Sequence, residues 1–158
     1  MAEAAHPTRP AALSSLWLGL SLLVACASRA PVVAVDGAPA SLEALLARHP
    51  LGADQQVRAD LLARSAGASY HLVQVRGREE PHRHASHDLV VLVLRGAGTL
   101  TLAEARMKLA AGDVALVRRA AAHWFANDGP EPAVALIIFT PPLDAPDTVP
   151  VDSSADGG

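Results

Sequence analysis

Histidines gathered in one stretch carry the clearest chemistry in this sequence. Four of the seven histidines fall between residues 77 and 127. His82 and His84 are two residues apart, and in a β-strand residues at this spacing share a face. His123 lies about forty residues further on and must reach the same place from another strand. Two imidazoles from one strand, a third from another and a nearby carboxylate predict a divalent-metal site inside a barrel.

Glycines, histidines and a carboxylate recur here in two motifs. Their members are Gly77, His82, His84, Asp88 and Gly96 in the first motif, and Gly112, His123 and Asn127 in the second. Together the motifs resemble those of the cupin family, in its small single-domain form (cupin 2 type), over roughly residues 55 to 145. The resemblance implies a barrel that holds a metal through its histidines. It does not specify a reaction, because the chemistry of one fold can be very diverse.

Both motifs depart from the family's pattern. In the second, Arg118 stands at the family's proline position and Ala120 at its second glycine position. In the first motif, the carboxylate residue differs from the one in the family's pattern. Two residues are therefore candidates for the fourth metal ligand.

The fourth ligand is either Asp88 or His87. Asp88 is shorter than the family's glutamate and lies one residue early when counted back from Gly96. If the strand is regular, Leu89 takes the glutamate's place. His87 then shares its face, and Asp88 points away. A β-bulge between His84 and Leu89 would reverse this choice.

The donor set also restricts the metal. Imidazole nitrogens with at most one carboxylate favour divalent Mn, Fe, Co, Ni, Cu or Zn over the oxygen-ligated Mg²⁺ and Ca²⁺. The alternative is a metal-free barrel whose histidines hydrogen-bond to one another or bind a ligand. Trp124 and Phe125 adjoin His123. If these two aromatic residues have a functional role, one of them forms a wall of the pocket. If they do not, both pack in the core, on alternate faces of the strand.

Short apolar segments separated by glycine and proline turns predict an all-β fold, an antiparallel jelly-roll barrel with a short N-terminal helix. Ser41 is expected to cap a helix from Leu42 to Arg48. Leu89 to Leu94 is apolar without alternation, which predicts a strand buried on both faces. Further strands are predicted at residues 55–63, 69–75, 99–102, 108–110, 114–117 and 133–140.

The first thirty residues differ from the rest. Leu16 to Ala25 is a short apolar run that fits the hydrophobic region of a secretory signal peptide. It ends in Leu23-Val24-Ala25-Cys26, which resembles the lipobox of bacterial lipoproteins. That resemblance implies cleavage before Cys26 and a lipid on its thiol, and the alternative is an ordinary signal peptide with a chance cysteine. A lipidated chain would lie on the periplasmic side of the cell envelope. Ala27, which is not acidic, favours the outer membrane over the inner.

The chain is expected to form one domain with terminal segments. The predicted segments are a signal peptide (1–25), a lipidated cysteine and tether (26–40), a short helix and connection (41–54), a cupin barrel (55–145) and a flexible tail (146–158). A net charge of −3 gives no basic surface for nucleic acid. The single cysteine excludes an internal disulfide.

Two functions of different classes fit these observations. The first is a metal-dependent enzyme, such as a dioxygenase or an isomerase, that acts on a small molecule in the cell envelope. The second is a module that binds or senses a metal or small ligand without turnover. A homodimer is also expected, because Leu89 to Leu94 and Ala133 to Phe139 offer more apolar strand surface than one small barrel buries.

Overall fold

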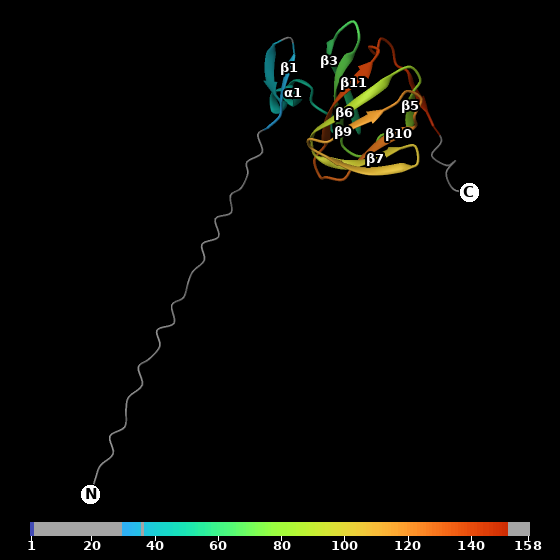
Figure 1. Cartoon of the computed structure of the whole chain (residues 1–158). Coiled ribbons are helices and arrows are strands. Elements are labelled where there is room, and N and C mark those ends of the chain that lie inside the picture. Colours follow the sequence, from blue (N-terminus) through green and yellow to red (C-terminus); the bar gives the residue numbers. More distant parts are fainter. Residues whose placement is uncertain (2–29, 36, 152–158) are drawn as a thin grey trace.

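Two five-stranded antiparallel sheets form the barrel (Figure 1). The computed structural model describes residues 1, 30–35 and 37–151. One sheet has the strand order β12-β5-β10-β7-β8 and the other β3-β4-β11-β6-β9. The first sheet consists of β12 (Thr148–Pro150), β5 (His82–His84), β10 (His123–Asn127), β7 (Ala97–Leu102) and β8 (Ala105–Ala110). The second consists of β3 (Val57–Arg64), β4 (Ser69–Val75), β11 (Ala133–Thr140), β6 (Asp88–Arg95) and β9 (Val114–Val117). The predicted jelly-roll barrel is confirmed.

Strand β6 is apolar on both faces, as predicted. Leu89, Val91 and Val93 face the barrel interior, where they line a cavity. Leu94, on the opposite face, belongs to a separate cluster outside the barrel, and Leu92 packs against that cluster. Two buried faces explain why this strand shows no polar alternation.

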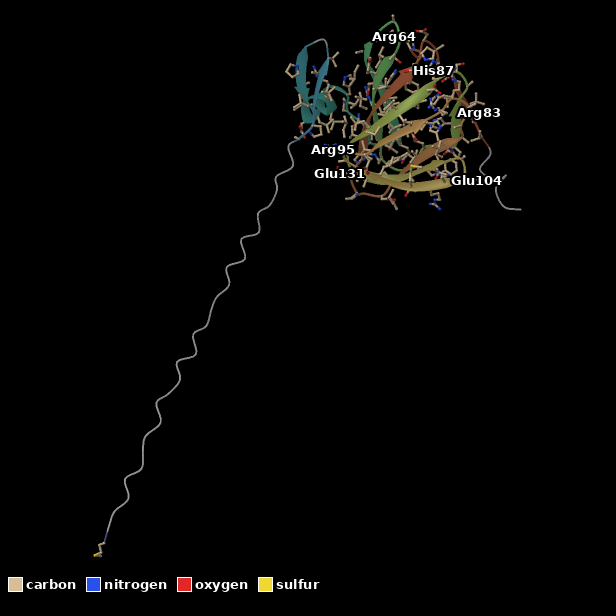
Figure 2. All side chains as sticks on the ribbon, viewed as in Figure 1. Arg64, Arg83, His87, Arg95, Glu104 and Glu131 are labelled. Carbon is tan, nitrogen blue, oxygen red and sulfur yellow. The ribbon has the colours of Figure 1, made fainter. Side chains whose placement is uncertain are left out.

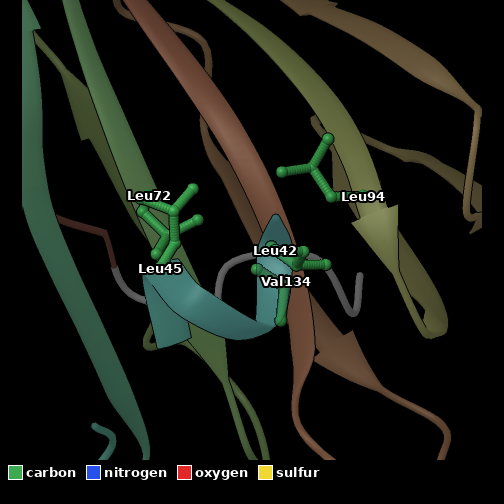
Figure 3. Close-up of a cluster of buried hydrophobic side chains, with 5 residues drawn as sticks. All are labelled: Leu42, Leu45, Leu72, Leu94 and Val134. Carbon is green, nitrogen blue, oxygen red and sulfur yellow. The ribbon is translucent and has the colours of Figure 1, made fainter. Parts of the chain in front are cut away.

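The cluster outside the barrel forms where a helix covers the second sheet. Helix α1 (Leu42–Arg48) begins as predicted, with the Ser41 side chain accepting the Ala44 N–H at 3.2 Å. Figure 3 shows the helix lying across the sheet, and its buried side chains join those of neighbouring strands. The cluster contains Leu42, Leu45, Leu72, Leu94 and Val134.

Two terminal segments differ from the prediction. Part of the predicted tether forms a hairpin, β1 (Val32–Val35) with β2 (Ala38–Ser41), and Val33 and Ala40 pack against the helix cluster. Part of the predicted flexible tail forms strand β12, which pairs with β5. Proline is tolerated on an edge strand, so the proline-rich composition that suggested a tail is compatible with this pairing.

Charged side chains lie around the outside of the barrel. Arg64, Arg83, Arg95, Glu104 and Glu131 are exposed at its periphery (Figure 2). In the part of the chain that the structure describes, no helix is long and apolar enough to cross a membrane.

Candidate metal centre

Three histidines converge inside the barrel. His82 and His84 lie on β5, and His123 begins β10, directly opposite His82 in the antiparallel register. One ring nitrogen from each histidine lies within 4.8 Å of the other two. The ring centroids of His82 and His123 are 4.4 Å apart, and His84 lies 5.2 Å from His82 and 5.4 Å from His123. The structure therefore brings together the three histidines that the sequence singled out.

Each of the three rings is oriented by a hydrogen bond from its Nδ1. The acceptors are the Glu80 carbonyl for His82 (2.7 Å), the Asp147 carboxylate for His84 (2.7 Å) and the Ala121 carbonyl for His123 (3.0 Å). Because these oxygens only accept hydrogen bonds, Nδ1 carries the proton in all three rings. Nε2 of each neutral ring then keeps its lone pair for a metal. Three such donors fit a divalent transition metal.

A turn before β10 connects two of these histidines. Ala120 has a φ of 61°, in the left-handed region that favours glycine. This explains why the family has a glycine at this position. The Ala120 N–H donates to the His84 carbonyl at 2.7 Å, and the next residue, Ala121, accepts the bond from His123. The turn therefore fixes the position of His123 on β10 relative to that of His84 on β5.

Burial keeps two of the rings neutral. It lowers the pKa of His123 from 6.5 to about 4, and the backbone bond to Ala121 only partly opposes this effect. Burial also lowers the pKa of His84, against the opposing effect of Asp147. Near neutral pH both imidazoles are therefore uncharged, which is the form that binds metal.

Asp147 is a site residue that the sequence analysis placed in the flexible tail. Its Oδ1 accepts from His84, and its Oδ2 accepts from the ring of His87 and from the Ser86 N–H at 3.1 Å. Burial opposes ionisation of this carboxyl, but the bonds from His87, His84 and Ser86 lower its pKa. No spacing rule pointed to Asp147, because it is 63 residues from His84.

His87 lies outside the three-histidine group. It is buried, and both ring nitrogens face acceptors, Nδ1 the Asp147 carboxylate and Nε2 the Pro142 carbonyl at 3.3 Å. Both nitrogens can donate together only when the ring is protonated. The structure therefore gives His87 the role of an Asp147 partner and not that of a fourth ligand.

Asp88 also lies outside the group. Its carboxylate accepts the backbone N–H of Arg119 at 2.8 Å and the guanidinium of the same residue at 3.1 Å. These bonds, with Arg118 nearby, lower the pKa of Asp88. Leu89 lines the cavity instead. The structure adopts the alternative in which Leu89 takes the family's glutamate position and Asp88 points away. The strand is not regular throughout, however, because the pairing of β6 with β11 shifts register at Leu94.

The three histidines line one cavity of about 490 Å³ inside the barrel. Phe125 is part of its wall, whereas Trp124 points to the other side of β10, where Arg78 lies 5.5 Å from its ring centroid. A Cβ at Gly98 would overlap the Phe125 ring. Because Gly98 on β7 has no side chain, the Phe125 ring has space to form part of the cavity wall.

Glu79 is a second residue that the sequence analysis missed. It lines the same cavity, and its Oε2 accepts the Phe125 N–H at 2.9 Å. Burial raises the pKa of this carboxyl, while His82 and the bond from Phe125 oppose that increase. Glu79 lies between the strand predicted at residues 69–75 and His82, so no strand periodicity indicated that it faces inward.

The fold and the site together place this protein among the jelly-roll barrels that carry a cluster of histidines inside the barrel. The cupin domain family matches residues 69–139, a range that contains all three histidines. A protein of Aquifex aeolicus (strain VF5), described as uncharacterized, is 36% identical over 107 residues, which are 68% of this chain and 88% of that protein. The chain belongs to the cupin family.

Solved structures share the fold at low sequence identity. A conserved Klebsiella pneumoniae protein with a double-stranded β-helix domain has a TM-score of 0.56 and 17% identity, over 65% of this chain and 90% of that chain. An oxalate decarboxylase has a TM-score of 0.55 and 24% identity, over 62% of this chain and 29% of that chain. These similarities concern the barrel and not its activity.

Replacing Asp147 by Asn should weaken metal binding. The neutral amide of Asn accepts a weaker hydrogen bond from Nδ1 of His84 than the charged carboxylate of Asp147 does. Loss of such a supporting partner typically costs about 10- to 100-fold in metal affinity. Competition between the protein and a chromophoric chelator for Zn²⁺ measures this change. Asp144→Asn is the control, since Asp144 lies in the same segment but is exposed and paired with Arg64. Equal zinc affinity in the wild type and Asp147→Asn would refute the supporting role.

Proposed function

We propose that this cupin binds one divalent transition metal per chain through Nε2 of His82, His84 and His123. One observation carries the proposal: all three Nδ1 atoms donate to oxygens of the chain, which leaves Nε2 free in each ring, and one ring nitrogen of each histidine lies within 4.8 Å of the other two. Mn, Fe, Co, Ni, Cu and Zn all suit such a nitrogen donor set.

We further propose that the protein is a metal-dependent enzyme acting on a small molecule, with dioxygenase- or isomerase-like chemistry. A bound metal would supply a Lewis acid that polarises a substrate oxygen. The chain supplies the other requirements. A cavity beside the histidines can exclude water, and Glu79 on its wall can exchange a proton or hydrogen bond with a ligand. Glu79 favours an enzyme over a module that only binds metal or ligand.

Removing any one of the three histidines should abolish tight metal binding. Loss of a supporting residue already costs about 10- to 100-fold, so His82→Ala, His84→Ala and His123→Ala should each cost more. Metal analysis after dialysis, with circular dichroism to verify the barrel, measures the effect.

The matched control is His71→Ala. His71 lines the same cavity but lies outside the three-histidine group, and its Nε2 is bonded to the Ser69 hydroxyl at 3.0 Å. The His71→Ala variant should retain the metal. The His87→Ala variant should also retain it, but with a reduced affinity. Full metal retention by all three ligand variants would mean that the histidines do not form a metal site.

We propose that the mature chain is a lipoprotein of the cell envelope, on the periplasmic side and in the outer membrane by preference. Cys26 lies outside the described residues, and the support is the sequence Leu23-Val24-Ala25-Cys26 after a short apolar run. Several acyl chains on one cysteine anchor a protein far more firmly than one chain. Labelled palmitate should enter the wild type and not Cys26→Ala, whereas equal labelling of both would contradict lipidation.

We propose that two chains associate through the outer face of the second sheet. Leu116 and Val114 on β9 are 60% and 57% exposed, beside the half-buried apolar residues Val90 and Leu92 of β6. Sedimentation should show a dimer at micromolar concentration, and Leu116→Asp should dissociate it. The surface would have no such role if the wild type sediments as a monomer.

A further inference from the structure

The cavity beside the metal centre is apolar apart from one region. Its apolar walls come from both sheets and include Val73, Val93, Leu100, Leu109 and Ile137. Its volume of about 490 Å³ lies within the roughly 300–1,000 Å³ typical of sites for drug-sized molecules. Such a space is much larger than a two-carbon diacid requires.

The cavity lining contains no cationic side chain among the described residues. No lysine or arginine contributes to it. Arg83, between two of the histidines, is exposed at the periphery of the barrel. Arg78 lies over Trp124, and Arg118 and Arg119 lie beside Asp88 on the outside. A ligand that carries a carboxylate or phosphate away from the metal would find no partner for that charge.

The charged groups that do line the cavity are acidic. Glu79 and Glu80 both belong to the lining, and Glu80 is exposed. Oε2 of Glu79 is occupied by the Phe125 N–H, whereas its Oε1 has no hydrogen bond to any described residue. This free oxygen can pair with a hydroxyl or carbonyl group of a ligand. The same carboxyl, when ionised, repels an anion.

The residue at the family's glutamate position also makes the cavity unfavourable for a charged ligand. Leu89 occupies that position and presents an apolar side chain beside the histidines. Burying an unpaired charge costs several kcal/mol or more, and a metal can compensate only the atom that it binds. The walls beyond the metal therefore select against a second charge.

We infer that the cavity takes a neutral, largely apolar small molecule that approaches the metal centre with a single oxygen donor. This inference rests on the proposed metal site and names the substrate class for it. Diacids such as oxalate and sugar phosphates fall outside the class. A phenol or an alcohol on a hydrocarbon body falls within it, with the oxygen at the histidines and the body against the apolar walls.

The test compares probes that differ in charge but not in shape. The probes are 2-naphthol, 6-(methylsulfonyl)naphthalen-2-ol and 6-hydroxynaphthalene-2-sulfonate, with oxalate as a small dianion. Each is titrated into Co²⁺-loaded protein, with the visible spectrum of the metal and calorimetry as readouts. 2-Naphthol should bind and perturb the cobalt bands. The methyl sulfone should bind at least about tenfold more tightly than the sulfonate of similar size, since a tenfold ratio corresponds to only about 1.4 kcal/mol.

Glu79→Gln separates the acidic group from the apolar walls. It removes the charge with little change of shape, so the ratio between the affinities for the methyl sulfone and the sulfonate should fall but stay above one. Glu104→Gln, at an exposed turn, should leave the ratio unchanged. The comparison in the wild type decides the substrate class even if Glu79→Gln fails to fold.

Failure of this inference differs from failure of the metal site. Cobalt content is measured on the same sample. If cobalt is bound and the sulfonate or oxalate binds as tightly as the neutral probes, or if 2-naphthol does not bind, the substrate class is wrong and the metal site stands. If no cobalt is bound, the metal site is wrong, and naphthol binding to the metal-free cavity still decides the ligand class.

Discussion

The protein must keep three imidazoles uncharged and correctly turned inside an apolar barrel, and most features of the site serve this requirement. Burial lowers the pKa of His123 to about 4 and disfavours the charged form of His84. A hydrogen bond from each Nδ1 selects the tautomer and leaves Nε2 free, in a group of rings whose nitrogens lie within 4.8 Å of one another. Burial alone would leave the rings free to turn, and the hydrogen bonds alone would not prevent protonation. Both conditions are met at His84 and His123.

Much of the barrel and the set of histidines could be predicted because they depend on local patterns. His82 and His84 share a face through the period of a strand, and the turns around Gly96 and Gly112 require positive φ angles that glycine adopts readily. The helix from Leu42 to Arg48 was recognisable from its capping residue. In these cases the responsible residues lie close together in the sequence.

The remaining parts of the site could not be predicted because they depend on contacts between distant segments. Asp147 comes from an edge strand whose composition resembles a disordered tail, and only its pairing with β5 brings it to His84. Glu79 faces inward because backbone bonds hold its segment against Phe125. The choice between His87 and Asp88 depended on whether a bulge lay between His84 and Leu89. That is a property of strand pairing, which one sequence does not reveal.

The contact between Asp147 and His84 also links the candidate site to the folding of the whole barrel. It joins residues 63 positions apart, and the contact with His87 joins residues 60 apart. Contacts of such long range form slowly, because the intervening chain must be ordered first. Strand pairs that build the second sheet, such as Ser69 with Phe139, are of similar range, so the candidate metal centre exists only in the folded barrel. An ion that binds only the completed centre stabilises the folded chain by mass action, so the concentration of free metal in its compartment would help to set how much of the protein stays folded.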